Sequence, residues 1–257
     1  MDSSEVTDLQ LQYIRSANQA LEALKLHWDF NEKHRAYVKS ISDWISYHDI
    51  FVEQEYDHAL KDVLNSGDNI KLLDIGANVG YFLLRAMVLR DAIKPSTRLC
   101  MHAVEGCSKT YKDLCDRIES QLEVGDKLAL HLGIVGKLQG TARFTDYDFS
   151  GWNTLYERSG TAIAEERKVE EREFLDLRAV FDELETVDLL KVNAEGSELV
   201  FFETYHEQLA KVREIVFVMH PKKYDIGACH DILKRVGFER IERVSKNWVF
   251  RAFRDKV

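Results

Sequence analysis

The spacing of hydrophobic residues along the chain changes near residue 65. Before that point, apolar residues recur every three or four positions, as on one face of a helix, in stretches that cover residues 9–30, 34–51 and 53–64. In the first stretch this face carries Leu11, Ile14, Ala17, Leu21, Leu24 and Trp28. The polar run NSGDN then ends the pattern. The spacing therefore predicts an N-terminal helical segment over residues 1–65.

From Ile70 onward, short apolar runs alternate with helical stretches, which is typical of βαβ units and a mainly parallel sheet. The pattern predicts strands at 71–75, 98–104, 127–135, 187–193, 214–219, 238–244 and 247–253. It predicts helices near 80–91, 108–123, 197–210 and 226–236. The last two strands have no helix between them, so we expect an antiparallel hairpin there. Residues 66–257 are thus predicted to form an α/β domain with a mixed, mainly parallel, seven-stranded sheet and flanking helices.

Composition narrows the class of protein. The chain has 257 residues, 45% of them hydrophobic, which suits a soluble globular domain with an appended segment. A net charge of -9 and the lack of a basic stripe argue against nucleic acid as a partner. No apolar stretch reaches the roughly 18 residues of a membrane span, and the N-terminus lacks a basic leader. We therefore expect a cytoplasmic protein without a membrane partner. The four cysteines form no CxxC pair and predict no metal centre.

The stretch KLLDIGANVGYF, residues 71–82, carries the first chemical signal. A predicted strand leads into a turn with Gly76 and Gly80, and a helix follows at once. In open α/β sheets such a turn lies at the ligand crevice, and glycine lets the backbone approach the ligand closely. A dinucleotide site would follow the pattern GxGxxG, but residue 78 is Asn. The turn therefore predicts a nucleotide-type ligand, with NAD as the less favoured one.

Two acidic residues at the ends of consecutive predicted strands narrow the choice of ligand. Asp74 precedes the turn, where a carboxylate would repel a pyrophosphate but could accept hydrogen bonds from an ammonium group. Glu105 ends the next strand, where an acid can accept the hydroxyls of a ribose. Together they favour S-adenosylmethionine over NAD. The plainer alternative is that Asp74 caps the helix and Glu105 is a solvated loop acid.

The motifs DIGANVGYF, HAVEG and VDLLKVNAEGSEL, in this order, resemble the FkbM-type family of class I S-adenosylmethionine-dependent methyltransferases. The resemblance covers about residues 50–245 and implies a Rossmann-like class I methyltransferase fold. It also implies O-methylation of sugars, polyketides and related small molecules, with S-adenosylmethionine as the cofactor. By the same resemblance, Asp74, Gly76, Asn78 and Gly80 hold the methionine side, Glu105 the ribose, Ile134 the adenine, and Asn193 lies at the methyl end.

Methyl transfer to a hydroxyl requires an aligned oxygen and a group that removes its proton. Glu195, in the turn after the fourth strand, and His220, at the end of the fifth, are the candidate catalytic bases. Their plainer interpretations are a carboxylate near a helix N-terminus and a histidine bonded to backbone. Relatives usually have Asp at the position of Asn193 and often Glu at that of Met219. These departures keep open a protein that binds the cofactor without transferring its methyl group.

The remaining predictions concern the acceptor and partners. Trp152 and Tyr156, in the glycine- and aromatic-rich segment 140–156, could line an acceptor pocket or form a small packing cluster. That segment is predicted to be a hairpin or a long loop. The N-terminal helices could cover the cofactor, form a homodimer face or pack on their own sheet. We expect a small-molecule acceptor and no metal in the site. An NAD-dependent oxidoreductase is the disfavoured third class.

Overall fold

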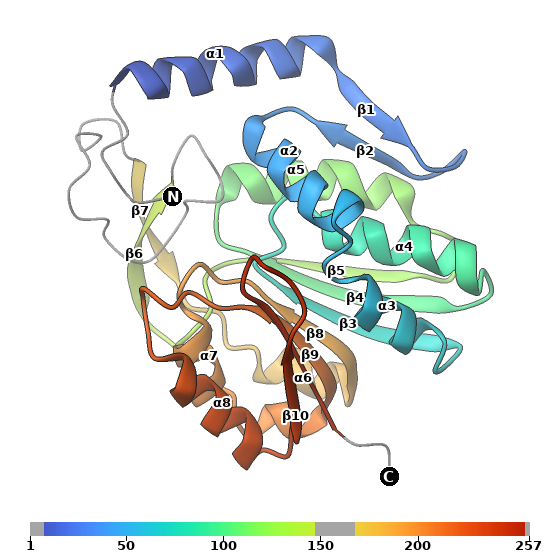
Figure 1. Cartoon of the computed structure of the whole chain (residues 1–257), viewed down its shortest axis with the longest axis vertical. Coiled ribbons are helices and arrows are strands. Elements are labelled where there is room, and N and C mark those ends of the chain that lie inside the picture. The colour runs from blue at the N-terminus through green and yellow to red at the C-terminus, as the bar shows by residue number, and fades with distance from the viewer. Residues whose placement is uncertain (1–7, 147–167, 255–257) are drawn as a thin grey trace.

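The computed structural model of the chain describes residues 8–146 and 168–254. At its centre is a seven-stranded sheet with the strand order β10-β11-β9-β8-β3-β4-β5 (Figure 1). Its strands are β3 (Asn69–Ile75), β4 (Arg98–Glu105), β5 (Lys127–Leu132), β8 (Val187–Val192), β9 (Val212–Val218), β10 (Arg240–Arg243) and β11 (Val249–Phe253). The seven predicted strands are all confirmed, with ends that differ by up to three residues.

The sheet is mixed in the predicted way. Strands β5, β4, β3, β8 and β9 are parallel neighbours, whereas β11 pairs antiparallel with both β9 and β10. The chain begins the sheet at β3, extends it through β4 and β5, and then returns to place β8 on the other side of β3. The strand order therefore reverses at the carboxyl end of β3, where open α/β sheets bind their ligands.

Helices cover both faces of the sheet (Figure 1). One face carries α3 (Asp57–Leu64), α4 (Tyr81–Ile93) and α5 (Ser108–Ile118), followed by the short helix η2 (Glu119–Gln121). The other face carries α6 (Arg178–Leu184), α7 (Glu198–Thr204) and α8 (Ile226–Arg235), with η4 (Gln208–Lys211) after α7. The sequence pattern did not predict helix α6. The helix predicted over 197–210 is divided into α7 and η4.

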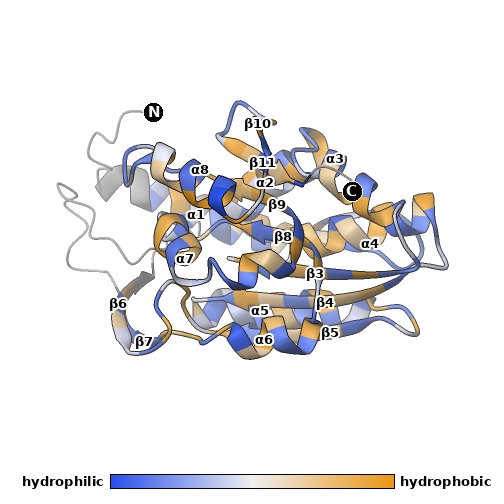
Figure 2. Cartoon of the chain, turned by 90° about the horizontal axis from the view of Figure 1, so that it is seen from below, coloured by the Kyte–Doolittle hydropathy of each residue, from blue (hydrophilic) through white to orange (hydrophobic). Residues whose placement is uncertain are grey.

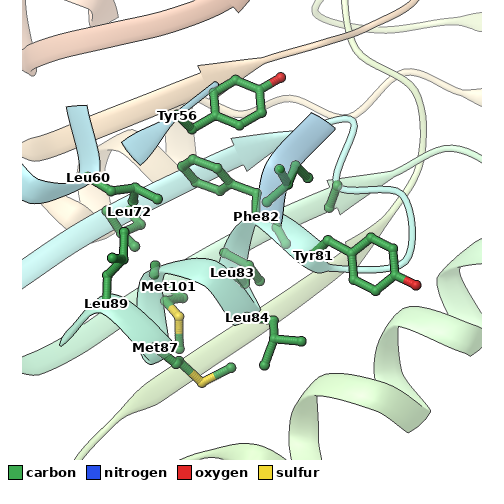
Figure 3. Close-up of a cluster of buried hydrophobic side chains, with 14 of the residues drawn as sticks. Tyr56, Leu60, Leu72, Tyr81, Phe82, Leu83, Leu84, Met87, Leu89 and Met101 are labelled. Carbon is green, nitrogen blue, oxygen red and sulfur yellow. The ribbon is translucent and has the colours of Figure 1, made fainter. Parts of the chain in front are cut away.

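Residues of the central strand β3 point to both faces of the sheet and contribute to two separate hydrophobic cores. In β3, Ile70 and Leu72 face the core under α3 and α4, whereas Leu73 and Ile75 face the core under α6 and α7. Because both faces are covered, β3 buries apolar residues on both sides and does not alternate between buried apolar and exposed polar residues. Figure 2 shows hydrophobic residues on the inner strands, and Figure 3 shows the first core, where Leu72 and Met101 meet side chains of α4.

The N-terminal segment is not helical throughout, so that part of the prediction is wrong. Helix α1 (Asp8–Leu24) ends at Lys25, whose φ of 49° is left-handed. A hairpin of β1 (Leu26–Asp29) and β2 (Arg35–Val38) follows, then α2 (Ile41–Tyr47) and the π-helix η1 (His48–Val52). Ala36 and Val38 are buried and alternate with less buried neighbours, which is the period of a strand. The apolar residues of this hairpin also fit a spacing of three or four, so the sequence pattern did not distinguish the hairpin from a helix.

The segment after β5 also differs from the prediction. Strand β6 (Thr141–Asp146) lies within the predicted hairpin or loop, but its antiparallel partner is β7 (Lys168–Glu173), more than 20 residues away. The predicted strand 127–135 ends at Leu132, and Ile134 makes only an isolated bridge to Phe174. Across the described ranges, every helix is too short or too polar to cross a membrane.

Candidate cofactor and active site

The glycine turn between β3 and α4 needs both of its glycines. Gly76 has a φ of 73°, and a Cβ placed on it would lie 1.9 Å from the carbonyl oxygen of Asn193. Gly80 has a φ of 88°, and its Cβ would lie 2.5 Å from Ile118 Cγ1. Residues with a side chain rarely adopt such a φ, and neither position leaves room for a Cβ atom. At Gly76 this close approach is to the β8 end and at Gly80 it is to α5, so both glycines are required by packing within the protein, whereas the sequence analysis expected them to make room for a ligand.

Asp74 is an internal anion and not a helix cap. Its side chain is fully buried, whereas the residue before α4 is Gly80, which makes no side-chain cap bond. Lys191 Nζ lies 2.9 Å from Asp74 Oδ1 and donates a hydrogen bond to the carbonyl of Gly76 at 2.6 Å. Burial raises the pKa of Asp74, and Lys191 opposes that rise. The Asp74–Lys191 pair thus links β3, β8 and the glycine turn.

Glu105 is buried, not solvated, and ties two loops together. Its Oε2 accepts the backbone N–H of Asn78 and its Oε1 that of Cys107, each at 2.9 Å. The residue is only 8% exposed, and burial raises its pKa although these hydrogen bonds oppose the shift. Each carboxylate oxygen keeps a second lone-pair direction for a ligand hydroxyl. The plainer alternatives for Asp74 and Glu105 are therefore both wrong.

The turn after β8 points several polar groups toward the same end of the sheet. The side-chain oxygen of Asn193 is buried and finds no hydrogen-bond partner in the described part of the chain. Glu195 has a left-handed φ of 49°, which is strained for a residue with a side chain. Glu198, the first residue of α7, accepts the backbone N–H groups of Ala194 at 2.8 Å and Gly196 at 3.0 Å.

His220 follows β9 and lies between two carboxylates. Its Nδ1 is 3.2 Å from Glu198 Oε1, and its Nε2 is 3.5 Å from Glu195 Oε2. Burial lowers the pKa of His220, but the two carboxylates outweigh burial and raise this pKa to about 9. The imidazole is therefore protonated at neutral pH. The ring faces carboxylates, so its interpretation as a histidine bonded to backbone is wrong.

These elements surround one cavity. Its lining includes the glycine turn (Gly76, Ala77, Asn78 and Val79), the ends of β8 and β9 (Lys191, Asn193, Glu195, Val218 and His220) and the N-terminal segment (Ser46, Asp49, Ile50, Glu55 and Tyr56). Tyr56 and Phe82 form an apolar part of the wall, with ring centroids 5.5 Å apart (Figure 3). Asn247, from the turn between β10 and β11, completes the lining.

Other predicted site residues lie outside this cavity, among them the buried Asp74, Gly80 and Glu105, or outside the described ranges. Ile134 is buried beside Gly106, where a small cluster adjoins Glu105. Trp152 and Tyr156 lie outside the described residues. Met219 is buried in the core under α7, so its departure from the family pattern does not alter the cavity lining.

One described cluster has the spacing of a possible metal site. It consists of His34, Asp91 and Glu123, away from the cavity. Its carboxylates already have cationic neighbours, because Arg90 donates to Asp91 and Lys33 to Glu123.

The residues fit a cofactor with an ammonium group, a sulfonium and a ribose. Gly76 and Asn78 belong to the cavity lining. The buried side-chain oxygen of Asn193 has no hydrogen-bond donor in the described part of the chain, and a ligand could supply one. Glu105 lies at the neighbouring strand end, as a ribose-binding acid does in such folds. The sheet order and its flanking helices are those of a Rossmann-like class I methyltransferase fold.

Comparisons with known proteins agree. A family model described as "Methyltransferase FkbM domain" matches residues 74–251. The chain belongs to the FkbM methyltransferase family, and its cofactor is S-adenosylmethionine. A search of curated proteins found no significant match.

Solved structures include a methyltransferase FkbM from Methylobacillus flagellatus KT, with 15% identity and a TM-score of 0.50. The match covers 95% of this chain and 60% of that one, so this chain spans less than two thirds of its relative. The N-terminal domain of EvdMO1, solved with S-adenosylhomocysteine bound, has 13% identity, coverages of 98% and 97%, and a TM-score of 0.45. A putative O-methyltransferase from Klebsiella pneumoniae has 13% identity, coverages of 96% and 100%, and a TM-score of 0.44.

Sequence reasoning missed three contributors to the site. Lys191 and Glu198 stand in the quoted motif VDLLKVNAEGSEL, but spacing gave no sign that they would pair with Asp74 and His220. Asp49, in the N-terminal segment, was not singled out, because only the fold brings that segment to the cavity.

Proposed function

We propose that this chain is a cytoplasmic S-adenosylmethionine-dependent O-methyltransferase that acts on a hydroxyl of a small molecule. One observation carries the proposal. The glycine turn, the β8 end, Glu195 and His220 line a single cavity at the carboxyl ends of β3, β8 and β9, so the turn and the proposed proton acceptors share one space. In open α/β sheets that position is the ligand crevice.

The cofactor supplies, when bound, an electrophilic methyl group on a sulfonium. Asp74 and the glycine turn are the proposed contacts for its methionine side, and Glu105 for its ribose. Ile134, beside Gly106, is the proposed adenine contact. The lining carries the carboxylates of Asp49, Glu55 and Glu195 against the cations of Lys191 and His220, and this small excess of negative charge favours a cationic cofactor.

Glu195 and His220 are the proposed acceptors of the hydroxyl proton. Both line the cavity, and their facing atoms are 3.5 Å apart, so a proton leaving the acceptor can be held between them. Because the pKa of His220 is about 9, only about 1% of the imidazole is neutral at pH 7. That small fraction is a stronger base than an ordinary histidine, and it grows as pH rises.

The lining also bears on the acceptor. Asn193 and Asn247 offer amide groups, and the acidic side chains offer hydrogen-bond acceptors, which suits a neutral, hydroxylated molecule such as a sugar. Trp152 and Tyr156, outside the described residues, stay proposed acceptor contacts.

The test uses S-adenosylmethionine with an isotopically labelled methyl group and a panel of sugars, polyketides and small phenols. We expect labelled product and S-adenosylhomocysteine, with the methyl group on oxygen by NMR. His220→Gln should lower kcat by about a hundredfold and leave cofactor binding intact. His206→Gln, at an exposed position, is the matched control. Cofactor binding without transfer to any acceptor would instead favour the non-methylating alternative, which the Asn193 departure suggested.

We also propose that the N-terminal helices form a homodimer face. Exposed apolar side chains on α1 and α2 support this, namely Tyr13, Leu24, Trp44 and Ile45.

A further inference from the structure

We infer that Glu198 is a positioning residue that acts through His220 and the Glu195 turn. This inference rests on the proposed function, because it assigns Glu198 the task of holding the proton-accepting pair in place. Glu198 does not line the cavity, so it would not touch the acceptor.

The first support is the burial of the Glu198 carboxylate. The side chain has no exposed surface, and both of its oxygens have partners. Oε1 accepts the N–H of Ala194 and Oε2 accepts the N–H of Gly196, so the carboxylate spans the turn that carries Glu195. A buried carboxylate without such partners would be costly.

The second support is the strained conformation of Glu195. A non-glycine residue at a φ of 49° persists only where its surroundings impose that conformation. Glu198 fixes the N–H groups on either side of Glu195, and Lys223 Nζ donates to the Glu195 carbonyl at 2.5 Å. The imposed conformation places Glu195 in the cavity lining.

The third support is the contact with His220. Oε1 of Glu198 lies 3.2 Å from Nδ1, on the side of the ring opposite the Glu195 contact at Nε2. Other polar groups near His220 are Lys223, and Tyr224, whose hydroxyl accepts the His220 backbone N–H at 3.2 Å. Glu198 is therefore the buried anion that fixes which ring nitrogen faces the cavity.

A role limited to structure and a positioning role differ in what Glu198→Gln should do. Glutamine keeps the shape but removes the charge beside Nδ1, and its NH₂ meets the N–H of either Ala194 or Gly196, so one hydrogen bond of the turn is lost. Because the removed charge lies 3.2 Å from Nδ1, the pKa of His220 should fall in Glu198→Gln. A role limited to closing the turn would leave the limiting kcat at high pH unchanged, whereas a positioning role predicts that this limiting kcat falls while KM for the cofactor does not change.

The experiment measures the His220 titration by NMR on histidine-labelled protein, with His220→Gln to assign its signal. It compares wild type, Glu198→Gln and the control Glu203→Gln, an exposed position on the same helix. We expect the pKa of about 9 in wild type and in the control, and a fall of at least about one unit in Glu198→Gln. In methyl-transfer assays, the limiting kcat at high pH should fall about tenfold or more because the base is misplaced, the rising limb of the pH profile should move to lower pH, and KM for the cofactor should stay similar.

An unchanged His220 titration in folded Glu198→Gln would overturn the inference, even if wild type transfers methyl groups. A lowered pKa in a protein whose wild type transfers none would overturn the proposed function and, with it, the catalytic task of Glu198. If Glu198→Gln does not fold, Glu198→Asp replaces it. Aspartate keeps the charge but withdraws it by one methylene, so we expect a still raised pKa and a lower kcat, and an unchanged kcat would contradict positioning.

Discussion

Among single residues, the protonation state of His220 decides both the chemistry of the site and part of the stability of the fold. His220 is protonated at neutral pH because two carboxylates outweigh its burial. A histidine whose pKa is higher in the folded state than in the unfolded chain stabilises the fold while it is charged. Its contribution is complete below its unfolded pKa of about 6.5 and is lost as pH rises through about 9.

The stability of wild type and His220→Gln should therefore converge as pH rises. We expect wild type to exceed the variant in free energy of unfolding by about 1–3 kcal/mol more at pH 6 than at pH 9.5. Urea unfolding at the two pH values measures this, with His206→Gln as the control. A difference that is independent of pH would contradict the raised pKa of His220.

A second prediction for a single residue concerns the two hydrogen bonds that Glu105 accepts. In Glu105→Gln the amide NH₂ must face either the N–H of Asn78 or that of Cys107, so one hydrogen bond is lost and two donors meet. We expect the affinity for S-adenosylmethionine to fall by about tenfold or more. Glu119→Gln, on η2, is the control for the loss of one negative charge. Calorimetric titration measures both, and equal affinities would count against Glu105 as a cofactor contact.

At the scale of elements, the carboxyl ends of β3 and β8 are held together by the Asp74–Lys191 pair. Both side chains are buried, so removing one leaves an uncompensated charge in the interior. That cost usually exceeds the net contribution of the intact pair.

Lys191→Met should therefore destabilise the fold by about 3–5 kcal/mol. The double variant Asp74→Asn with Lys191→Met should lose less than the sum of the two single variants. Denaturant unfolding of the full cycle measures this, with Lys127→Met, exposed at the start of β5, as the control. Strict additivity would show that the two residues do not interact.

The elements also show what sequence could predict. The inner strands β3, β4, β8 and β9 were predictable because burial on both faces leaves short apolar runs. Gly76 and Gly80 were predictable because only glycine fits their backbone. The β1–β2 hairpin was missed since its four-residue strands fit a helical spacing as well. Strand β7 reads KVEERE and has too few apolar residues to signal a strand. The contacts of Glu198 and Lys191 depend on long-range packing, which no local pattern records.

At the scale of the whole molecule, distant segments close the cavity. Glu55 accepts hydrogen bonds from Ser245 Oγ and Asn247 Nδ2, each at 2.7 Å, so the N-terminal segment and the β10–β11 turn meet at its rim. The outer side of the same N-terminal segment carries α1 (Figure 1). Leu24 on α1 is 70% exposed.

If the proposed homodimer uses that side, Leu24→Glu should shift the protein toward monomer. The reason is that a charge placed in an apolar interface must be desolvated. Size-exclusion chromatography with light scattering measures the mass over a range of concentrations. Val124→Glu, at a fully exposed position, is the control. A monomeric wild type at high concentration would contradict the dimer.

The glycine turn after β3 is proposed to bind S-adenosylmethionine. This can be measured by calorimetric titration of wild type, Gly76→Ala and Gly67→Ala with S-adenosylmethionine, S-adenosylhomocysteine and NAD. A Cβ at Gly76 collides with the Asn193 carbonyl, whereas one at Gly67 makes only an ordinary contact at 3.5 Å. We predict that wild type and Gly67→Ala bind both adenosyl ligands and not NAD, and that Gly76→Ala binds none. Binding of NAD alone, or equal adenosyl binding by folded Gly76→Ala, would show that this turn is not the binding site for S-adenosylmethionine.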